Sequence, residues 1–462
     1  MIDRAPPARG TSLRQVLPDA VFTSGDVEVR SCCTDSRQCR PGDLFVTLLG
    51  GASDGGECVA EAIEHGATAV LSDRPLPGCT VPLCVVDDVR DAYGRLCQAL
   101  AGYPARSLKI VGITGASGKT TTSYLSAAVL AAGGWRSGVL GTLGYFDGNE
   151  WQNACWTTPP PPVLAQWLAR IAAAGCTHAA VEVSGHALAQ KRVAGLDFDV
   201  ACVTNDHHGF KGHRKAQLFD HLLPEGFAVV NVDDPLAENF LSRLDGPVLT
   251  VGMRGAAEVT ALPLEQFPSE QTFLLSVGDE SIPVRSPLIG HQNIYNCLVA
   301  AAVGLAYSID LPTIVQGLEV VQRVPGRLER IECGQPFSVF VDDARTPGAL
   351  SRCLKTLRAV TSGRLICVFD AGGDRDKPSG GQMYRAVESA ADLAVQVVDD
   401  RREAIASALG HAQPGDCVLI AGKSHETTQA PGDKHYEFGD RQVARQCLYE
   451  SLAAERLYRA SA

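Results

Sequence analysis

The sequence predicts an α/β protein of three domains: a small α/β domain at residues 1–107, a central P-loop parallel-sheet domain at 108–325, and a Rossmann-like domain at 326–462. A chain of 462 residues exceeds what one hydrophobic core usually accommodates. Near residue 108, a β-branched run, a glycine-rich turn and a helix-like segment follow one another, the order typical of a phosphate-binding loop. Beyond residue 326, apolar strand-like runs alternate with helix-like segments, which indicates a parallel sheet.

Composition excludes several classes of protein. Hydrophobic residues make up 45% and charged residues 20% of the chain, which is ordinary for a soluble globular protein. A net charge of −11 argues against nucleic acid as a partner. The sequence has no basic leader with an apolar core and no apolar run long enough to span a bilayer. We therefore expect a cytoplasmic monomer that works on small molecules and does not insert into membranes.

The 16 cysteines are scattered, mostly through apolar runs, and no C-x-x-C pair occurs among them. Cys32 and Cys33 are adjacent in the chain. This distribution favours reduced, buried thiols over a disulfide framework or a cysteine metal site.

In the first domain, residues typical of turns precede a predicted strand. Cys32–Arg37 and Arg40–Asp43 precede an apolar run at Leu44–Leu49, and the side chains of Asp35–Arg37 could serve the turn alone. Asp91 is placed to cap the second of two predicted helices. The predicted helices are Ala60–His65 and Asp91–Ala101, and the further strands are Ala67–Leu71 and Val81–Val86.

The central domain opens on Leu108–Ser123, where a buried strand turns through Gly115–Thr120 into a helix. Glycines allow backbone N–H groups to face an anion, and the helix N-terminus adds about half a positive charge. In such a loop Lys119 reaches the β- and γ-phosphates, and the Thr120 hydroxyl ligates Mg²⁺. Ile113 stands where the strict pattern has glycine, so an ordinary strand–helix turn remains the alternative. Three threonines at the helix start favour the phosphate loop, because β-branched residues contribute little stability there.

Two further strands of this domain end in polar side chains. The strand His178–Val183 carries Glu182, which is either a magnesium ligand or a structural acid. The strand Asp197–Thr204 runs into the polar segment Asn205–Lys215, at the edge where parallel sheets bind ligands, although a solvated loop is the alternative. The other predicted elements are strands at Arg136–Gly141 and Phe227–Asn231, and a helix at Val163–Ala174 after the proline run 159–162.

The third domain repeats strand and helix. Its predicted strands are Ser338–Asp342, Leu365–Asp370, Leu393–Val398 and Cys417–Ala421, and its predicted helices are Pro347–Ala359, Gln382–Ala390 and Arg402–Leu409. Two loops, Gly372–Asp376 and Gly422–Glu426, each follow a strand. Since the ends of parallel strands share one edge of a sheet, both loops belong to that edge.

Taken in order, these segments resemble the Mur ligase family, most closely the branch that adds the third peptide residue to UDP-N-acetylmuramoyl-L-alanyl-D-glutamate. The resemblance runs from Thr34 to Glu426 and so covers nearly the whole chain. The matching motifs are TDSRQCRPGDLFVTLLGGASDG (Thr34–Gly55), GITGASGKTTT (Gly112–Thr122), TTP (Thr157–Pro159), EVSGHALAQKRV (Glu182–Val193), TNDH (Thr204–His207), KAQLF (Lys215–Phe219), GHQNIYN (Gly290–Asn296), VPGRLE (Val324–Glu329), TP (Thr346–Pro347), GGDRD (Gly372–Asp376) and AGKSHE (Ala421–Glu426).

The resemblance implies the three-domain Mur ligase architecture and an ATP-dependent amide-bond ligation in peptidoglycan precursor synthesis. In this family the N-terminal domain binds the UDP-sugar, the central domain binds ATP, and the C-terminal domain delivers the amino acid. With ATP and Mg²⁺, the D-glutamyl carboxylate is phosphorylated, the amine of the amino acid attacks the acyl phosphate, and phosphate leaves. The added residue is then meso-diaminopimelate or L-lysine.

The resemblance also implies roles for individual residues. The catalytic set is Lys119, Glu182, His207 and Lys215, and the metal ligands are Thr120, Glu182, His207 and an N-carbamoylated Lys215. Carbamate formation needs a neutral amine, so burial or nearby cations must favour that form. The ATP site contains Gly115, Ala116, Ser117, Gly118, Lys119, Thr120, Thr121, Asn293, Arg327 and Asp342. The UDP-substrate site contains Ser36, Thr157, Thr158, Ser184, Gln190 and Arg192, and the amino-acid site contains Arg375, Gly422 and Glu426.

The chain departs from the family pattern at several places, including Trp156 and Gly185, which replace an asparagine and a serine. The segment 205–215 is shorter than usual, which leaves His207 and His208 as alternative ligands. Asp343 and Arg345 replace the usual tyrosine and histidine. The D-N-P-R motif that reads the incoming diamino acid is absent, and without its arginine a carboxylate is bound more weakly.

Two other classes of protein therefore remain open. One is a catalytically silent paralogue that binds nucleotide or UDP-sugar as a scaffold or regulator, and the intact Gly118, Lys119, Thr120, Glu182 and Lys215 oppose it. The other is a ligase that acts on a different acid, such as a folate polyglutamate, and the DSR…PGDLF pattern of the first domain opposes that.

Overall fold

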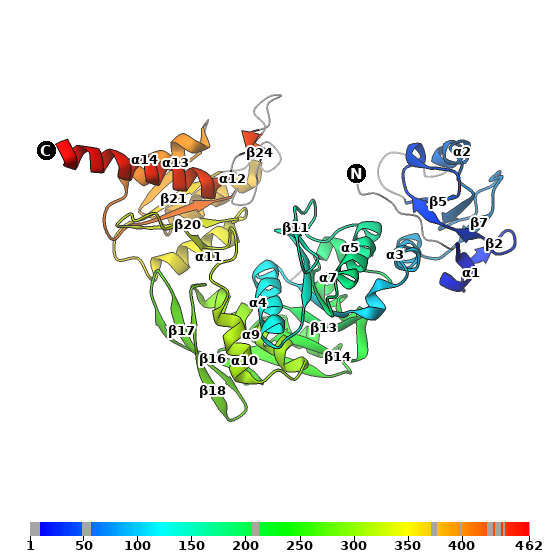
Figure 1. Cartoon of the computed structure of the whole chain (residues 1–462), viewed down its shortest axis with the longest axis horizontal. Coiled ribbons are helices and arrows are strands. Elements are labelled where there is room, and N and C mark those ends of the chain that lie inside the picture. Colours follow the sequence, from blue (N-terminus) through cyan, green and yellow to red (C-terminus); the bar gives the residue numbers. More distant parts are fainter. Residues whose placement is uncertain are drawn as a thin grey trace. The chain divides into compact units, whose positions relative to one another are not determined.

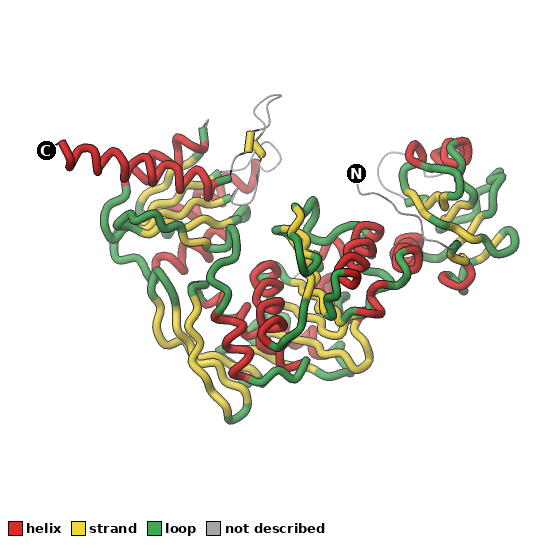
Figure 2. Tube along the Cα trace, viewed as in Figure 1, coloured by secondary structure: helices red, strands yellow, loops and turns green. Residues whose placement is uncertain are grey.

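The computed structural model describes residues 10–48, 57–205, 212–370, 377–397, 400–422, 428–429, 436–437 and 439–461 (Figure 1). The chain forms two compact units, of which the first comprises Met1–Lys119 and Gly134–Leu249 and the second Thr120–Gly133 and Thr250–Ala462. Strands alternate with helices in both units, as the sequence predicts for an α/β protein (Figure 2).

A five-stranded sheet organises the N-terminal part of the first unit. Its strand order is β2–β7–β6–β5–β4, parallel from β4 to β7 and with β2 antiparallel at one edge. Along β4 to β7, successive side chains point to opposite faces of the sheet and so enter two separate hydrophobic cores. One core is shared with α1 and α3, and the other with α2. The elements are β1 Thr11–Ser12, α1 Leu13–Val16, β2 Val21–Phe22, β3 Glu28–Val29, β4 Ser31–Cys33, η1 Ser36–Gln38, β5 Asp43–Val46, α2 Glu57–Glu64, β6 Ala69–Ser72, β7 Leu83–Val85 and α3 Val89–Leu100.

Two sequence-based expectations about this part are wrong. The side chain of Asp88, not Asp91, caps α3, because it accepts hydrogen bonds from the backbone N–H groups of Arg90 and Asp91. Cys33 and Cys39 are joined by a disulfide, whereas the sequence favoured reduced thiols throughout. The 3₁₀ turn η1 folds Cys39 back towards Cys33, and residue spacing alone did not reveal this proximity.

A second sheet of the first unit carries the phosphate loop. Its strands pair in the order β11–β10–β9–β12–β8–β13–β14, parallel from β9 to β14 and with β10 and β11 antiparallel. The parallel strands are almost wholly buried, as sheets covered on both faces require. The elements are η2 Pro104–Ser107, β8 Lys109–Thr114, β9 Ser137–Gly141, β10 Gly144–Phe146, β11 Trp151–Gln152, α5 Pro161–Ala173, β12 His178–Glu182, α6 Gly185–Ala189, β13 Phe198–Val203, α7 Gly212–Ala216, η3 Phe219–His221, β14 Leu222–Asn231 and α8 Ala237–Leu241.

The second unit begins with the helix that follows the phosphate loop. Most of α4 packs with this unit, and the Thr122 hydroxyl donates a hydrogen bond to Asn296 Oδ1 of α9 at 3.3 Å. An antiparallel hairpin pair, β16–β17–β18, follows β15 and was not predicted from the sequence. These elements are α4 Lys119–Ala132, β15 Val248–Gly252, β16 Val259–Gln266, β17 Gln271–Val277, β18 Glu280–Ser286, α9 His291–Ala306 and α10 Leu311–Glu319.

The last sheet of the second unit has the order β19–β20–β23–β21–β22, and its four long strands are parallel as predicted. The fully buried guanidinium of Arg401 donates hydrogen bonds to both carboxylate oxygens of Asp440, at 2.6 and 2.7 Å, and to the Ala421 carbonyl. This ion pair joins α13, α14 and β23. The elements are β19 Glu329–Arg330, β20 Ser338–Asp342, α11 Pro347–Arg358, β21 Leu365–Phe369, α12 Lys377–Glu388, β22 Leu393–Gln396, α13 Arg401–His411, β23 Cys417–Ala421, β24 Thr428–Gln429, β25 Tyr436–Glu437 and α14 Asp440–Ser461.

Candidate active site

The glycine loop leaves β8 at the edge of the sheet where parallel strands end. Gly115 and Gly118 have φ angles of 155° and 87°, which L side chains rarely adopt. A Cβ on Gly115 would also collide with the Thr204 hydroxyl, so only glycine fits there. The side chain of Lys119 folds over the loop and donates to the Gly115 carbonyl at 2.8 Å. Strand, turn, lysine and helix therefore form the predicted phosphate-loop geometry.

Two residues at the end of β13 fix the shape of this loop. The backbone carbonyl of Asn205 accepts a hydrogen bond from the Ala116 N–H at 2.8 Å. Its side-chain Oδ1 accepts one from the Ser117 N–H at 3.1 Å. The Thr204 hydroxyl and the Asn205 amide donate to the Ser117 carbonyl at 2.6 and 3.0 Å. Two of the loop N–H groups are therefore hydrogen-bonded to Asn205 in this structure.

Glu182 ends β12 beside the loop, in register with Ile113 of β8. Its carboxylate is fully buried and accepts hydrogen bonds from Thr142, at 3.0 Å from the backbone N–H and 2.9 Å from the hydroxyl. A Cβ on Gly141 would collide with the same carboxylate. Burial of a carboxylate is costly unless it is hydrogen-bonded, and Thr142 supplies those bonds.

Several predicted substrate residues gather around Thr158. The Thr158 hydroxyl donates to the Glu182 carbonyl at 2.8 Å and accepts from the Ser184 N–H at 3.0 Å. The guanidinium of Arg192 donates to the Thr158 carbonyl at 2.7 Å, and burial lowers the pKa of Arg192. Thr157 joins through a hydroxyl contact of 3.1 Å with Thr142. Four predicted residues and Glu182 therefore share one hydrogen-bonded cluster.

The other two predicted substrate residues contact different partners. The Gln190 side chain accepts a hydrogen bond from Arg90 of α3 at 3.2 Å, which links the two sheets of the first unit. Ser36 lies in η1 and donates its hydroxyl to the Glu61 carboxylate of α2. Ser36 is 5% exposed, so its hydroxyl is occupied by the protein itself.

Lys215 lies in α7, close to the end of β12. It is 9% exposed, and its side chain passes within 3.9 Å of a Cβ placed on Gly185, three residues after Glu182. The Lys215 side chain thus packs against the start of α6, just beyond the end of β12. The predicted ligand His207 and its alternative His208 fall outside the described residues.

In the second unit, Thr120 and Arg327 come together. The Arg327 guanidinium reaches the Thr120 hydroxyl at 3.5 Å and donates to the Asp343 carboxylate at 3.0 Å. Arg345 also donates to Asp343, at 2.9 Å. The two residues that depart from the family pattern, Asp343 and Arg345, thus pair with each other and hold Arg327.

Asp342 and Asn293 support this region from within the fold. Asp342 accepts a hydrogen bond from the Leu328 N–H at 2.8 Å, next to Arg327, and burial raises the pKa of Asp342. Asn293 donates to the Ile289 carbonyl at 2.8 Å and accepts from Asn296 at 3.0 Å. The N–H of Gly422 donates to the Asp342 carbonyl at 3.0 Å. Arg375 and Glu426, the other predicted amino-acid residues, lie outside the described residues.

Sequence reasoning missed Thr142 and Gly141 as parts of this site, and it placed Asn205 at the ligand-binding edge of the sheet without its contacts to the glycine loop. Thr142 follows β9 just as Glu182 ends β12, and β9 and β12 are parallel neighbours. Knowledge of that strand order would have indicated Thr142, because neighbouring parallel strands end at one edge.

We expect Thr142→Val to lower turnover about tenfold or more, because it removes a hydrogen bond to a buried carboxylate while keeping the side-chain shape. Thr142→Ser restores the hydroxyl and is the matched control. Initial rates of phosphate release and the thermal unfolding midpoint of both variants would be measured. Equal turnover of the valine and serine variants would contradict the role given to the hydroxyl.

A glycine loop with its lysine at the end of a central parallel strand defines the chain as a P-loop nucleotide-binding protein. Family models narrow this class: "Mur ligase family, catalytic domain" matches residues 28–100, "Mur ligase middle domain" matches 113–304, and "Mur ligase, glutamate ligase domain" matches 326–398. The chain belongs to the Mur ligase family and is an ATP-dependent ligase.

Individual relatives match nearly the full length. A UDP-N-acetylmuramoyl-L-alanyl-D-glutamate–2,6-diaminopimelate ligase from Geobacillus thermodenitrificans is 36% identical, covering 93% of this chain and 97% of its own. The ligase of the same name from Gloeobacter violaceus is 37% identical, covering 92% and 94%. A solved structure of a ligase of that name has a TM-score of 0.72 at 27% identity, covering 96% of this chain and 99% of its own. The predicted Mur ligase fold is therefore confirmed.

Proposed function

We propose that this ligase adds diaminopimelate to UDP-N-acetylmuramoyl-L-alanyl-D-glutamate in peptidoglycan precursor synthesis. The observation that carries the proposal is full-length similarity to relatives that bear this name, at 36% and 37% identity. The same relatives give no support to a catalytically silent paralogue. The proposed location is the cytoplasm, and the proposed state is a monomer. In the described part of the chain, no helix combines the length and apolar character needed to cross a membrane.

The reaction must turn an unreactive carboxylate into an electrophile. The D-glutamyl carboxylate attacks the γ-phosphorus of ATP, and the β–γ bridging bond breaks to release ADP. The amine of the incoming amino acid then attacks the carbonyl carbon of the acyl phosphate. The carbon–oxygen bond to phosphate breaks, the amine loses a proton, and an amide and phosphate remain. Catalysis of both steps depends on fixed positive charge and hydrogen-bond donors around the transferred group.

Lys119 is the cation that would follow the β- and γ-phosphates. In the structure its ammonium group binds the Gly115 carbonyl at 2.8 Å, so its charge is held at the loop before ATP arrives. Arg327 reaches the Thr120 hydroxyl and carries a second positive charge to the start of α4. Preorganised cations of this kind stabilise charge that develops during transfer without further rearrangement.

The residues proposed as metal ligands fit Mg²⁺ by their chemistry. The Thr120 hydroxyl, the Glu182 carboxylate and a carbamate on Lys215 are all hard oxygen donors, and the fully buried Glu182 is oriented by two hydrogen bonds from Thr142. His207 completes the proposed set. When bound, Mg²⁺ neutralises phosphate charge and polarises the phosphoryl group. The protein's part is to keep these oxygens oriented and shielded from water.

The cluster around Thr158 is the proposed contact surface for the sugar and peptide part of the substrate. Arg192 and Ser184 present charged and polar groups there, and a partly buried guanidinium interacts strongly with an anion. Gln190 and Ser36 extend the site towards the N-terminal sheet. Gly422, with Arg375 and Glu426, is proposed for the amino acid. Without the D-N-P-R arginine, other groups of the C-terminal domain must hold its carboxylate.

The test is phosphate release from ATP in the presence of the UDP-muramoyl dipeptide and one amino acid at a time. We expect release with meso-diaminopimelate and little with L-lysine, with the tripeptide product identified by mass. Release with L-lysine alone would correct the amino acid, and no release with any amino acid would reject the ligation.

A further inference from the structure

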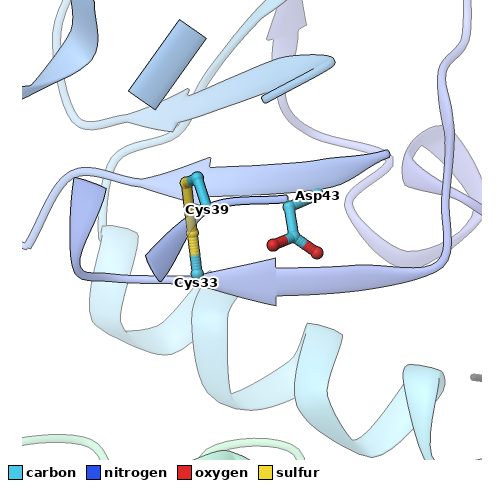
Figure 3. A group of neighbouring side chains, drawn as sticks. All are labelled: Cys33, Cys39 and Asp43. Atoms are coloured by element: carbon cyan, nitrogen blue, oxygen red, sulfur yellow. A yellow bond between two sulfur atoms is a disulfide. The ribbon is translucent and has the colours of Figure 1, made fainter. Parts of the chain in front are cut away.

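The turn that carries Ser36 is bracketed by two cysteines. Strand β4 ends at Cys33, η1 follows at Ser36–Gln38, and Cys39 terminates η1 by donating its N–H to the Ser36 carbonyl at 3.3 Å. Figure 3 shows the disulfide between Cys33 and Cys39 with the carboxylate of Asp43 beside it. The bridge closes a small ring around Asp35, Ser36 and Arg37.

The backbone of this turn suits a disulfide. The Cα atoms of Cys33 and Cys39 are 6.1 Å apart, inside the range of about 4.4–6.8 Å found for native disulfides. Asp43 accepts hydrogen bonds from the Ser31 hydroxyl and, at 2.9 Å, from the Arg40 N–H. These bonds hold the chain on either side of the two cysteines whether or not the bridge is formed.

Asp43 also makes a metal site less favourable than a thiol pair. Cys33, Cys39 and Asp43 offer three possible ligand atoms within 4.8 Å of one another. Both carboxylate oxygens of Asp43 already accept hydrogen bonds from the protein, and the two sulfur atoms are joined to each other. The arrangement is built for sulfur–sulfur chemistry, with Asp43 as a structural support.

Cys33 and Cys39 are buried, at 3% and 6% exposed, and they differ from the other cysteines in their placement across a turn. Cys32 belongs to the core on the opposite face of β4, where its sulfur makes a hydrogen bond of 3.9 Å with that of Cys97 and no disulfide. Burial raises the pKa of the Cys84 thiol to about 11 and that of Cys297 to about 12, so few thiolates form there. Cys155 is free and exposed. Cys33 and Cys39 are joined by a disulfide across the turn that contains Ser36, a residue proposed to bind the UDP-substrate.

The bridged turn holds Ser36 in an occupied state. Its hydroxyl binds Glu61 of α2, and Ser36 is 5% exposed. Asp35 fixes the same turn by accepting from the Arg37 N–H at 3.1 Å and from the Arg37 guanidinium at 2.9 Å. A ligand that bonds to the Ser36 hydroxyl has to compete with Glu61, which is easier if the turn can move away from α2. A covalent bridge across the turn restricts that movement, because it limits the backbone angles the turn can reach.

We propose that Cys33 and Cys39 form a reversible thiol–disulfide site that lowers affinity for the UDP-substrate when oxidised. The effect on affinity rests on the proposed function, which assigns Ser36 to that substrate. The oxidant is a low-molecular-weight disulfide. The thiolate of one cysteine attacks it and releases one thiol, and the second cysteine then attacks the mixed disulfide and releases another. Two protein thiols and one disulfide thus become one protein disulfide and two small thiols, which carry away the two protons.

The test uses the full chain with Cys155→Ser, so that the exposed thiol does not react. The protein is treated with dithiothreitol or with oxidised glutathione. Direct binding of the UDP-muramoyl dipeptide is then measured by calorimetry without ATP, beside steady-state rates. We expect oxidation to weaken binding and raise KM for this substrate about fivefold or more, a usual size for coupling between sites, with kcat nearly unchanged.

The bond itself is assigned by mass spectrometry. Trypsin cuts after Arg37, whose side chain is 75% exposed, so the peptides that carry Cys33 and Cys39 stay together only when the disulfide is present. Cys33→Ala and Cys39→Ala should each abolish both the linked peptide and the response of affinity. Cys32→Ala with Cys97→Ala is the matched control and should keep both. A bridge over a ring this short contributes about 2 kcal/mol to stability, so the variants should still fold, and their thermal midpoints check this.

The outcomes separate the site from the proposed function. A linked peptide without a change in affinity or KM overturns the control of substrate binding. No linked peptide under oxidation overturns the site, as does a change in affinity caused by zinc and reversed by a chelator in the reduced protein. If the reduced enzyme lacks turnover with every amino acid, the ligase proposal fails, and calorimetry with the same ligand still decides the inference.

Discussion

Lys119→Ala is expected to lower the rate of phosphate release about a thousandfold, the usual cost of removing a preorganised group that stabilises transition-state charge. The structure places the ammonium group of Lys119 on the Gly115 carbonyl at 2.8 Å, above the loop and outside the hydrophobic core. Removing the side chain therefore takes away a charge at the phosphates without opening a cavity. The loop itself keeps its shape, because Thr204 and Asn205 hold it through the Ser117 carbonyl.

The measurement is the initial rate of phosphate release with saturating substrates, beside the thermal unfolding midpoint. Lys109→Ala is the matched control, since Lys109 stands at the other end of the same strand and pairs with Asp199 at 2.8 Å on an exposed surface. This control should retain wild-type turnover. Near-normal turnover in Lys119→Ala would reject the phosphate loop as the ATP site. A large loss of stability in Lys119→Ala would show that the lysine serves the fold.

The parallel strands were predictable because their burial leaves a plain signal in the sequence. Strands β8, β12 and β13 consist of apolar runs buried on both faces, and each run ends at a polar residue that marks the sheet edge. The antiparallel strands β16–β18 were missed, although β17 buries alternate residues such as Phe273 and Leu275. In the sequence, the polar residues of their exposed faces and their short turns look like those of surface loops, because the sequence does not show which strands are neighbours. Helix α9 is apolar nearly all round, so it lacks the amphipathic pattern that indicates a helix.

Sequence reasoning identified the candidate residues that lie in a recognisable motif. It missed the residues whose contacts depend on the order of strands in the sheet. Motifs indicated Lys119, Glu182 and Lys215, of which Glu182 ends β12, Lys119 follows the loop after β8, and Lys215 lies against Gly185; their catalytic roles stay predictions. Thr142 has no motif of its own, and its importance arises only from the pairing of β9 with β12. Likewise, no motif indicated that the guanidinium of Arg401 is buried against Asp440. Such roles depend on tertiary contacts that one sequence does not specify.

Lys215→Ala is expected to lower turnover about a hundredfold or more, because the proposed carbamate supplies an anionic oxygen that no other side chain replaces. Lys215 is 9% exposed, and its side chain packs against Gly185, three residues beyond Glu182. The measurement is phosphate release by the alanine variant with and without added acetate or formate, at constant ionic strength.

Two comparisons distinguish an anion at this position from a simple cation. If the carbamate is the working group, short carboxylates should partly restore the alanine variant, because the space left by the side chain admits a small anion near Glu182. Lys215→Arg should stay inactive and gain nothing from them, since a guanidinium keeps its positive charge and fills the space. Substantial activity in the arginine variant would instead assign Lys215 a cationic role towards phosphate. Full activity of the alanine variant without any carboxylate would remove Lys215 from catalysis, leaving Lys119, Thr120 and Glu182 as the residues on which the chemistry depends.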